Sequence, residues 1–290
     1  DHRDLHSFPT RRSSDLMVHW HIIGHAITNP EWLDISDIRD SHGIWAPDIE
    51  CVDGKYYIYV TLRLNADGKR DNNVMRRQLV MVSDKPEGPY SKPVCLEVDD
   101  IDPSLFVDDD GTPWMSWGNG TCFLVKLKPN MTELDGNIEI LKMPKFVEGP
   151  WIHKRGNLYY LTYASMGKGR ETISYATAPS MDGPWTYRGV LTGMAENSFT
   201  IHPGIIEFKG QNYLFYHNAI LTIDSKSGAT GRRSVCIDYL YYLPDGRMAY
   251  VEQTKEGITV KPKTAAEVAE IVNPYTDEKE VVVEKEVIAD

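Results

Sequence analysis

The 290-residue sequence is poor in the features that mark disulfide scaffolds, membrane spans and nucleic-acid-binding proteins. It has four cysteines, with no CxxC pair and no regular spacing, so neither a disulfide framework nor a zinc site is indicated. No apolar run approaches the length of a membrane span. Basic residues are in deficit, 31 Lys and Arg against 42 Asp and Glu, and the net charge of −11 would repel nucleic acid and anionic membranes. Neutral ligands remain open as partners.

Helical periodicity is also nearly absent before residue 264, although 41% hydrophobic residues are enough to bury a core. Residues 1–16, DHRDLHSFPTRRSSDL, show no strand or helix periodicity, and we expect a non-native leader there. Residues 264–290 are acidic, short of aromatics and interrupted by Pro274, which predicts a linker or the start of a following module. Residues 17–263 are therefore the expected domain.

What the sequence does contain is a repeat made of a lead-in, a glycine turn and an aromatic strand. It occurs as APDIECVDGKYYIYVT, IDPSLFVDDDGTPWMSW, VEGPWIHKRGNLYYLTYA and IHPGIIEFKGQNYLFYH. The turn glycines are Gly54, Gly111, Gly156 and Gly210, at spacings of 57, 45 and 54 residues. Asp-Gly and Lys-Gly between β-forming residues predict hairpins at these points.

A second half-motif, a strand, a Gly-Pro-aromatic turn and another strand, appears as MVSDKPEGPYSKPV and SYATAPSMDGPWTYRGV. Several units of four strands are typical of a β-propeller. Residues 17–27, MVHWHIIGHAI, resemble the last strand of an earlier unit. The sequence therefore predicts an all-β fold, a five-bladed β-propeller with blade one incomplete, and a β-sandwich is the alternative.

Four ionisable residues stand in a similar register before the turn glycines. Asp48, Asp102, Glu148 and His202 precede them by six, nine, eight and eight residues. In a propeller the innermost strand of each blade begins at the channel mouth, so these side chains are expected around one pocket. Taken singly, each is more often a surface group, a turn cap or a structural histidine, and together they could also form a polar plug without chemistry.

Convergent carboxylates suit the cleavage of a glycosidic bond. One acid, kept protonated by burial and neighbouring charge, donates a proton to the leaving oxygen, and another, ionised, activates water or attacks carbon. Trp45, Trp117 and Trp151 could stack on sugar rings or pack in the core.

Five motifs together resemble glycoside hydrolase family 43: GIWAPDI, IDPSLFVDDDG, FVEGPWIHKRGNLYYLTYA, NSFTIHPGIIEFKGQNYLFYHN and RRSVCIDYLYYLPDG. The resemblance runs from about Met17 to Lys261, and the WGNG and EGPWIHK segments are most similar to the arabinofuranosidase and β-xylosidase branches. It implies a five-bladed propeller and an inverting mechanism that uses three acidic residues.

By motif, the resemblance implies that Glu148 is the general acid and that Asp102 orients Glu148 and raises its pKa. With the tryptophans suggested by stacking on sugars, the candidate substrate-binding residues are Asp48, Trp45, Trp117, His202 and Arg233, the last of which could also be a surface charge beside Arg232. His202 corresponds to an axial histidine that in some relatives helps to hold a calcium ion or a water cluster. No cofactor is required, and a structural calcium ion at the propeller axis is the metal that the resemblance allows.

The general base of the family is an Asp in the first strand of blade one, a segment expected before residue 17. Asp4 and Asp15 lie outside any family motif, and Asp34 and Asp37 fall between blades one and two. None of these four aspartates is assigned as the general base. We therefore expect this chain to hydrolyse weakly or not at all, whereas its full-length parent is active.

The sequence as a whole predicts a glycosidase that removes terminal or branching α-L-arabinofuranosyl or β-D-xylosyl residues from arabinoxylan-type plant polysaccharide, with inversion. Arabinoxylan and arabinan are the expected partners. The alternatives are an endo-arabinanase, a non-catalytic carbohydrate-binding propeller and a structural scaffold with a polar axis. A polymeric substrate predicts that the parent protein is secreted or periplasmic.

Overall fold

The computed structural model describes residues 10–13, 17, 20–25, 44–65, 74–222, 225–226, 228 and 232–288. The four aspartates considered as bases, Asp4, Asp15, Asp34 and Asp37, lie outside them. The chain forms two compact units: unit 1 comprises residues 1–119, 123–139 and 287–290, and unit 2 comprises residues 120–122 and 140–286. Within the described ranges, the structure contains no helix with the length and apolar character needed to cross a membrane.

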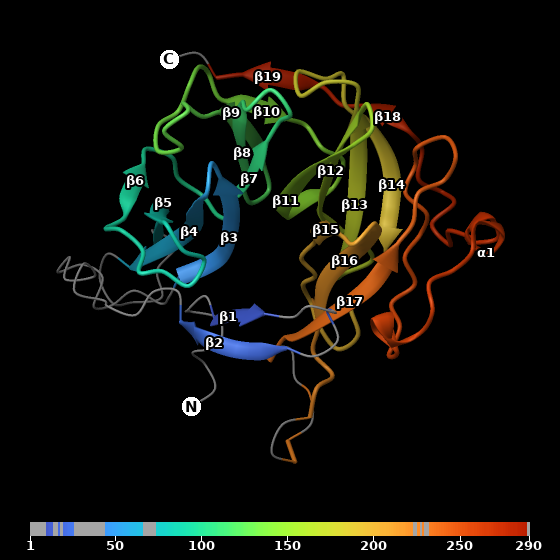
Figure 1. Cartoon of the computed structure of the whole chain (residues 1–290). Helices are drawn as coiled ribbons and strands as arrows, with labels where there is room; N and C mark the ends of the chain where they lie inside the picture. Colours follow the sequence, from blue (N-terminus) through green and yellow to red (C-terminus); the bar gives the residue numbers. More distant parts are fainter. Residues whose placement is uncertain are drawn as a thin grey trace. The chain divides into compact units, whose positions relative to one another are not determined.

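Unit 1 is built on antiparallel hairpins (Figure 1). One sheet has the order β3-β4-β5-β6, with β3 (Ile44–Val52), β4 (Lys55–Asn65), β5 (Val74–Ser83) and β6 (Val94–Leu96). Another sheet, whose strands β7 (Ser104–Val107) and β8 (Pro113–Trp117) lie in unit 1, has the order β7-β8-β9-β10-β19, with β9 (Cys122–Lys126), β10 (Glu139–Leu141) and β19 (Lys285–Val287). A two-stranded sheet joins β1 (Thr10–Ser13) to β2 (His21–His25). β1 lies in the leader segment, where the sequence pattern indicates no strand.

Unit 2 contains the other two sheets. The first has the order β11-β12-β13-β14-β18, with β11 (Phe146–Arg155), β12 (Leu158–Met166), β13 (Glu171–Ala178), β14 (Thr186–Thr192) and β18 (Val281–Val282). The second comprises β15 (Gly204–Phe208), β16 (Gln211–Asn218) and β17 (Ser234–Leu240). They are followed by the 3-10 turn η3 (Gly257–Thr259) and the short helix α1 (Ala265–Ala269), which starts with a capping box between Thr264 and Glu267. β18 and β19 show that part of the acidic tail joins these sheets.

The turn glycines predicted from the repeat all lie in hairpin loops, between β3 and β4, β7 and β8, β11 and β12, and β15 and β16. Asp53 and Gly54 have φ of +50° and +75°, and Lys209 and Gly210 have φ of +52° and +75°. Two successive positive φ angles are the geometry of a type I′ turn, which matches the twist of the flanking strands. The predicted hairpins are therefore confirmed, and at Gly54 and Gly210 the backbone conformation of the turn residues explains them.

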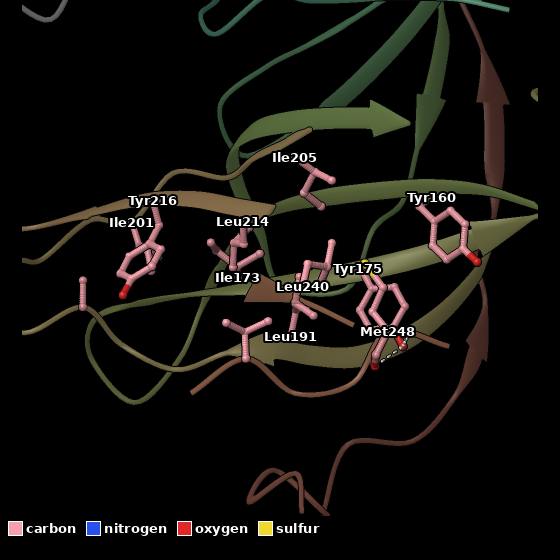
Figure 2. Close-up of a cluster of buried hydrophobic side chains, with 12 residues drawn as sticks. Tyr160, Ile173, Tyr175, Leu191, Ile201, Ile205, Leu214, Tyr216, Leu240 and Met248 are labelled. Atoms are coloured by element: carbon pink, nitrogen blue, oxygen red, sulfur yellow. Dashed lines mark hydrogen bonds between the residues drawn. The ribbon is translucent and has the colours of Figure 1, made fainter. Parts of the chain in front are cut away.

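The core of unit 2 lies on one face of the β11–β14 sheet and between it and β15–β17. It joins Tyr160, Ile173, Tyr175, Leu191, Ala195, Ile201, Ile205, Leu214, Tyr216, Leu240, Met248 and Val251 (Figure 2). Every residue of β13 is buried, so this strand is covered on both faces and shows no alternation of apolar and polar residues. In unit 1 a corresponding cluster includes Tyr59, Val80, Leu105, Met115 and Trp117.

Candidate active site

Glu148 lies in an irregular stretch near the start of β11. The register of β11 against β12 shifts on both sides of it, between Phe146 and Glu148 and between Glu148 and Trp151. Such irregularities are over-represented next to active sites. Glu148 stands opposite Ala164 of β12, and the following Gly149 has a φ of +60°.

His202 lies directly against this stretch. A Cβ built on Gly149 would be 2.4 Å from Nε2 of His202, so the imidazole occupies the space that any other side chain would need. Gly149 is thus required by a close approach as well as by its positive φ. Two of the four residues in the predicted register, Glu148 and His202, are brought together within unit 2.

A third group at this place, Glu171, was missed by the sequence reasoning. Glu171 is the first residue of β13 and its side chain is only 2% exposed. Its Oε2 accepts a hydrogen bond from the backbone N–H of Ile201 at 3.1 Å, and its own N–H donates to the carbonyl of Phe199 at 3.0 Å. The available signal was a carboxylate at the head of the buried strand ETISYATA, the same kind of signal that singled out Glu148.

The groups that shift the pKa of Glu171 show which charged residues lie near it. Burial, and after it the nearby charge of Glu148, raise the pKa of Glu171 to about 7. The Ile201 N–H and the charges of His202 and Arg233 act in the opposite direction. The side chain of Arg233 is exposed and lies before β17, which starts at Ser234. Unit 2 therefore gathers two carboxylates, an imidazole and a guanidinium around one buried position.

Asp102, in unit 1, is held in a strained backbone conformation. It has a φ of +62°, which is uncommon for a residue with a Cβ, and such strain is concentrated at functional sites. Its N–H donates to Oγ1 of Thr61 at 3.1 Å, and Thr61 is itself hydrogen-bonded to Gln78. Asp102 and Glu148 belong to different units, so the role of Asp102 in orienting Glu148 stays a prediction.

Asp48 uses both of its carboxylate oxygens on the backbone of unit 1. Oδ2 accepts the N–H of Leu105 at 2.7 Å and Oδ1 accepts the N–H of Ile49 at 2.8 Å. The side chain is 7% exposed, and burial raises its pKa to about 6 against the lowering effect of these bonds. This geometry ties β3 to β7 and gives Asp48 a structural function, and the substrate contact expected from the sequence stays a prediction.

Asp48→Ala is expected to lower the free energy of unfolding by about 2–4 kcal/mol, because the backbone N–H groups of Leu105 and Ile49 lose their acceptor. Urea unfolding measures the effect, with Glu87→Ala at an exposed position as the control. Equal midpoints for the two variants would contradict the structural function of Asp48.

The tryptophans differ in exposure. Trp117 is 2% exposed, stacks on Phe123 with ring centroids 5.2 Å apart and donates its indole N–H to the carbonyl of Asp99. Of the two roles considered for Trp117 the structure shows core packing, and its contact with a sugar stays a prediction. Trp45 and Trp151 are half-buried. An exposed aromatic ring that the sequence did not single out, Phe199 at 48%, lies on the segment that carries His202.

The described residues provide no ligand set for a metal. Within those ranges no group of three or more His, Cys, Asp or Glu side chains is arranged to hold a metal ion. Calcium takes six to eight oxygen ligands, so a single imidazole does not make a calcium site. The described residues therefore do not fit the calcium expected at His202.

Paired carboxylates of unequal environment, beside a cation and an exposed aromatic ring, are an arrangement for acid-assisted cleavage of a glycosidic bond, the chemistry of a glycosidase. The family described as Glycosyl hydrolases family 43 matches residues 2–248, and the chain belongs to this family. The match begins within the segment that was expected to be a leader. The family resemblance seen in the sequence is confirmed.

Individual relatives agree with this assignment. The chain is 28% identical over 257 residues to a "Xylosidase/arabinosidase" of Bacteroides ovatus, covering 73% of this chain and 74% of the relative. It is 27% identical over 227 residues to an "Arabinoxylan arabinofuranohydrolase" of Bacillus subtilis, covering 62% of this chain and 43% of the relative.

The structure resembles that of the GH43_1 enzyme of Xanthomonas citri complexed with xylotriose, with a TM-score of 0.67 and 26% identity, covering 80% of this chain and 78% of that chain. Together with the antiparallel sheets of three to five strands seen in the described residues, this similarity establishes an all-β fold of the propeller class, and the number of five blades stays a prediction.

Proposed function

We propose that this glycosidase releases terminal or branching α-L-arabinofuranosyl or β-D-xylosyl residues from arabinoxylan-type polysaccharide, with inversion. The observation that carries the proposal is the acid site of unit 2, where Glu148 lies beside His202 and the buried Glu171. A general acid at this position can give its proton to a leaving sugar oxygen. The relatives named for xylosidase, arabinosidase and arabinoxylan activities support the substrate class.

In this proposal Glu148 is the general acid. Asp102 has a positive φ, and its backbone N–H donates to Thr61. The family resemblance implies that this residue orients the acid. Arg233 and Phe199 are exposed near the acid site and are suited to bind sugar hydroxyls and a sugar face, respectively. A secreted or periplasmic location of the parent protein follows from a polymeric substrate.

The test compares hydrolysis and binding on the chain joined to a blade-one segment of the family that supplies the general base. 4-Nitrophenyl α-L-arabinofuranoside and β-D-xyloside report turnover, xylotriose titrated by calorimetry reports binding, and NMR of the released sugar reports its anomeric form. Release of monosaccharide with inversion supports the proposal. Binding with no turnover of any substrate would favour the carbohydrate-binding alternative, and release of oligomers from linear arabinan would favour the endo-arabinanase.

A further inference from the structure

Glu171 is tied to the segment that carries His202. The segment from Phe199 to His202 precedes β15, and Glu171 meets it twice, through its backbone N–H at Phe199 and through its carboxylate at Ile201. The carboxylate bond is the one that depends on the side chain. Removing that acceptor would leave the N–H of a buried residue unsatisfied.

The hydrophobic core fixes both ends of this contact. Ile201, 0% exposed, and Ile173, two residues after Glu171, both belong to the core cluster of unit 2 (Figure 2). Close packing holds them in place, so the Glu171 carboxylate and the Ile201 N–H meet with little freedom. The residue after Ile201 is His202, whose ring covers Gly149.

Strand register places Glu171 and Glu148 on one face of the sheet. Glu148 is opposite Ala164, and Ala164 is opposite Ile173. Directly opposed residues share a face, and so do residues two apart on one strand, which brings Glu171 to the side on which Glu148 lies. The charged groups that act on Glu171 come from three segments: Glu148 on β11, His202 before β15 and Arg233 before β17.

We propose that Glu171 is a positioning residue of the acid site, whose carboxylate anchors the His202 segment and is electrostatically coupled to the carboxylate of Glu148. The interaction between the two carboxylates is mutual, so each disfavours the ionisation of the other and they release their protons as a coupled pair. The raised pKa of Glu171 accords with this arrangement. The proposal rests on the proposed glycosidase function in one respect, that Glu148 acts as the proton donor.

The charge is tested by NMR of protein labelled with ¹³C at the glutamate carboxyl carbons, with Glu148 assigned by comparison with Glu148→Gln. Glu171→Gln preserves shape and a hydrogen-bond acceptor but removes the charge. In this variant the titration midpoint of Glu148 is expected to fall by about one pH unit or more. Glu207→Gln, at an exposed position of β15, is the control and should leave the midpoint in place. An unchanged midpoint in Glu171→Gln would overturn the charge function.

The anchor is tested by comparing Glu171→Gln with Glu171→Ala. The amide signal of Ile201 and the ring signals of His202 should shift strongly in the alanine variant, which has no acceptor, and little in the glutamine variant. Equal shifts in the two variants would overturn the anchoring function. Both measurements are independent of turnover, so failure of the proposed hydrolysis and failure of this inference are distinguishable. The glutamine variant keeps the charge test valid if the alanine variant does not fold.

Discussion

With the general base supplied by a blade-one segment of the family, Glu148→Gln is expected to lower kcat/KM for an unactivated xylo-oligosaccharide by about 10²–10⁴-fold, the usual contribution of a general acid. Glutamine keeps the shape of the side chain but has no proton to deliver to a leaving sugar alcohol. Glu148 stands opposite Ala164 in a distorted stretch of β11, so an amide of the same size can occupy its place. The affinity for xylotriose should therefore change much less than the rate.

Substrates with different leaving groups distinguish the loss of the proton donor from a general disruption of the active site. A dinitrophenyl glycoside releases a phenolate that needs no proton, so the rate on this substrate should fall far less than the rate on xylobiose. The alkaline limb of the pH profile of kcat/KM, which reports the protonated acid, should disappear in Glu148→Gln. Glu207→Gln is the matched exposed control. Equal losses on both substrates would contradict the assignment of Glu148 as the proton donor.

Gly149→Ala is expected to lower kcat/KM by about 10²-fold or more, because a displacement of about 1 Å in a catalytic site has effects of this size. The new Cβ would meet Nε2 of His202 at 2.4 Å, so the imidazole must leave its place beside Glu148. The positive φ of +60° adds about 1–2 kcal/mol of backbone strain for a residue with a Cβ.

The chain provides a matched control for this variant. Gly156, at the hairpin between β11 and β12, has a φ of +57° and no atom within 4 Å of a Cβ built on it. Gly156→Ala should therefore show the strain alone, about 1–2 kcal/mol in urea unfolding, with unchanged kinetics. If the two variants lose the same stability and the same activity, the contact between Gly149 and His202 has no functional weight.

Some features of the fold were predictable because their causes are local. A two-residue hairpin loop needs a positive φ, so the glycine is visible in the sequence wherever such a turn occurs, as at Gly54 and Gly210. The family motifs around Glu148 and His202 are likewise contiguous, and their fixed distances to the following glycine placed both residues at the start of a blade.

Other features depend on which segments meet in space. Asp48 resembles a pocket residue in its motif, but the N–H of Leu105 that its carboxylate accepts comes from a different sheet. Trp117 has the composition of a sugar platform, and only packing against Phe123 and its neighbours shows that its ring is buried. Burial depends on how the sheets pack together, so it cannot be read from a short stretch of sequence.

The sequence by itself determined the β-hairpin units, the family and the candidate acid, since each is written in short motifs. Only the tertiary structure decided that Glu171 shares the site of Glu148, because the hydrogen bond to Ile201 and the alignment of β11, β12 and β13 join residues far apart in the chain. Short-range patterns specify turns and strands, whereas the electrostatic surroundings of a carboxylate are set by long-range packing.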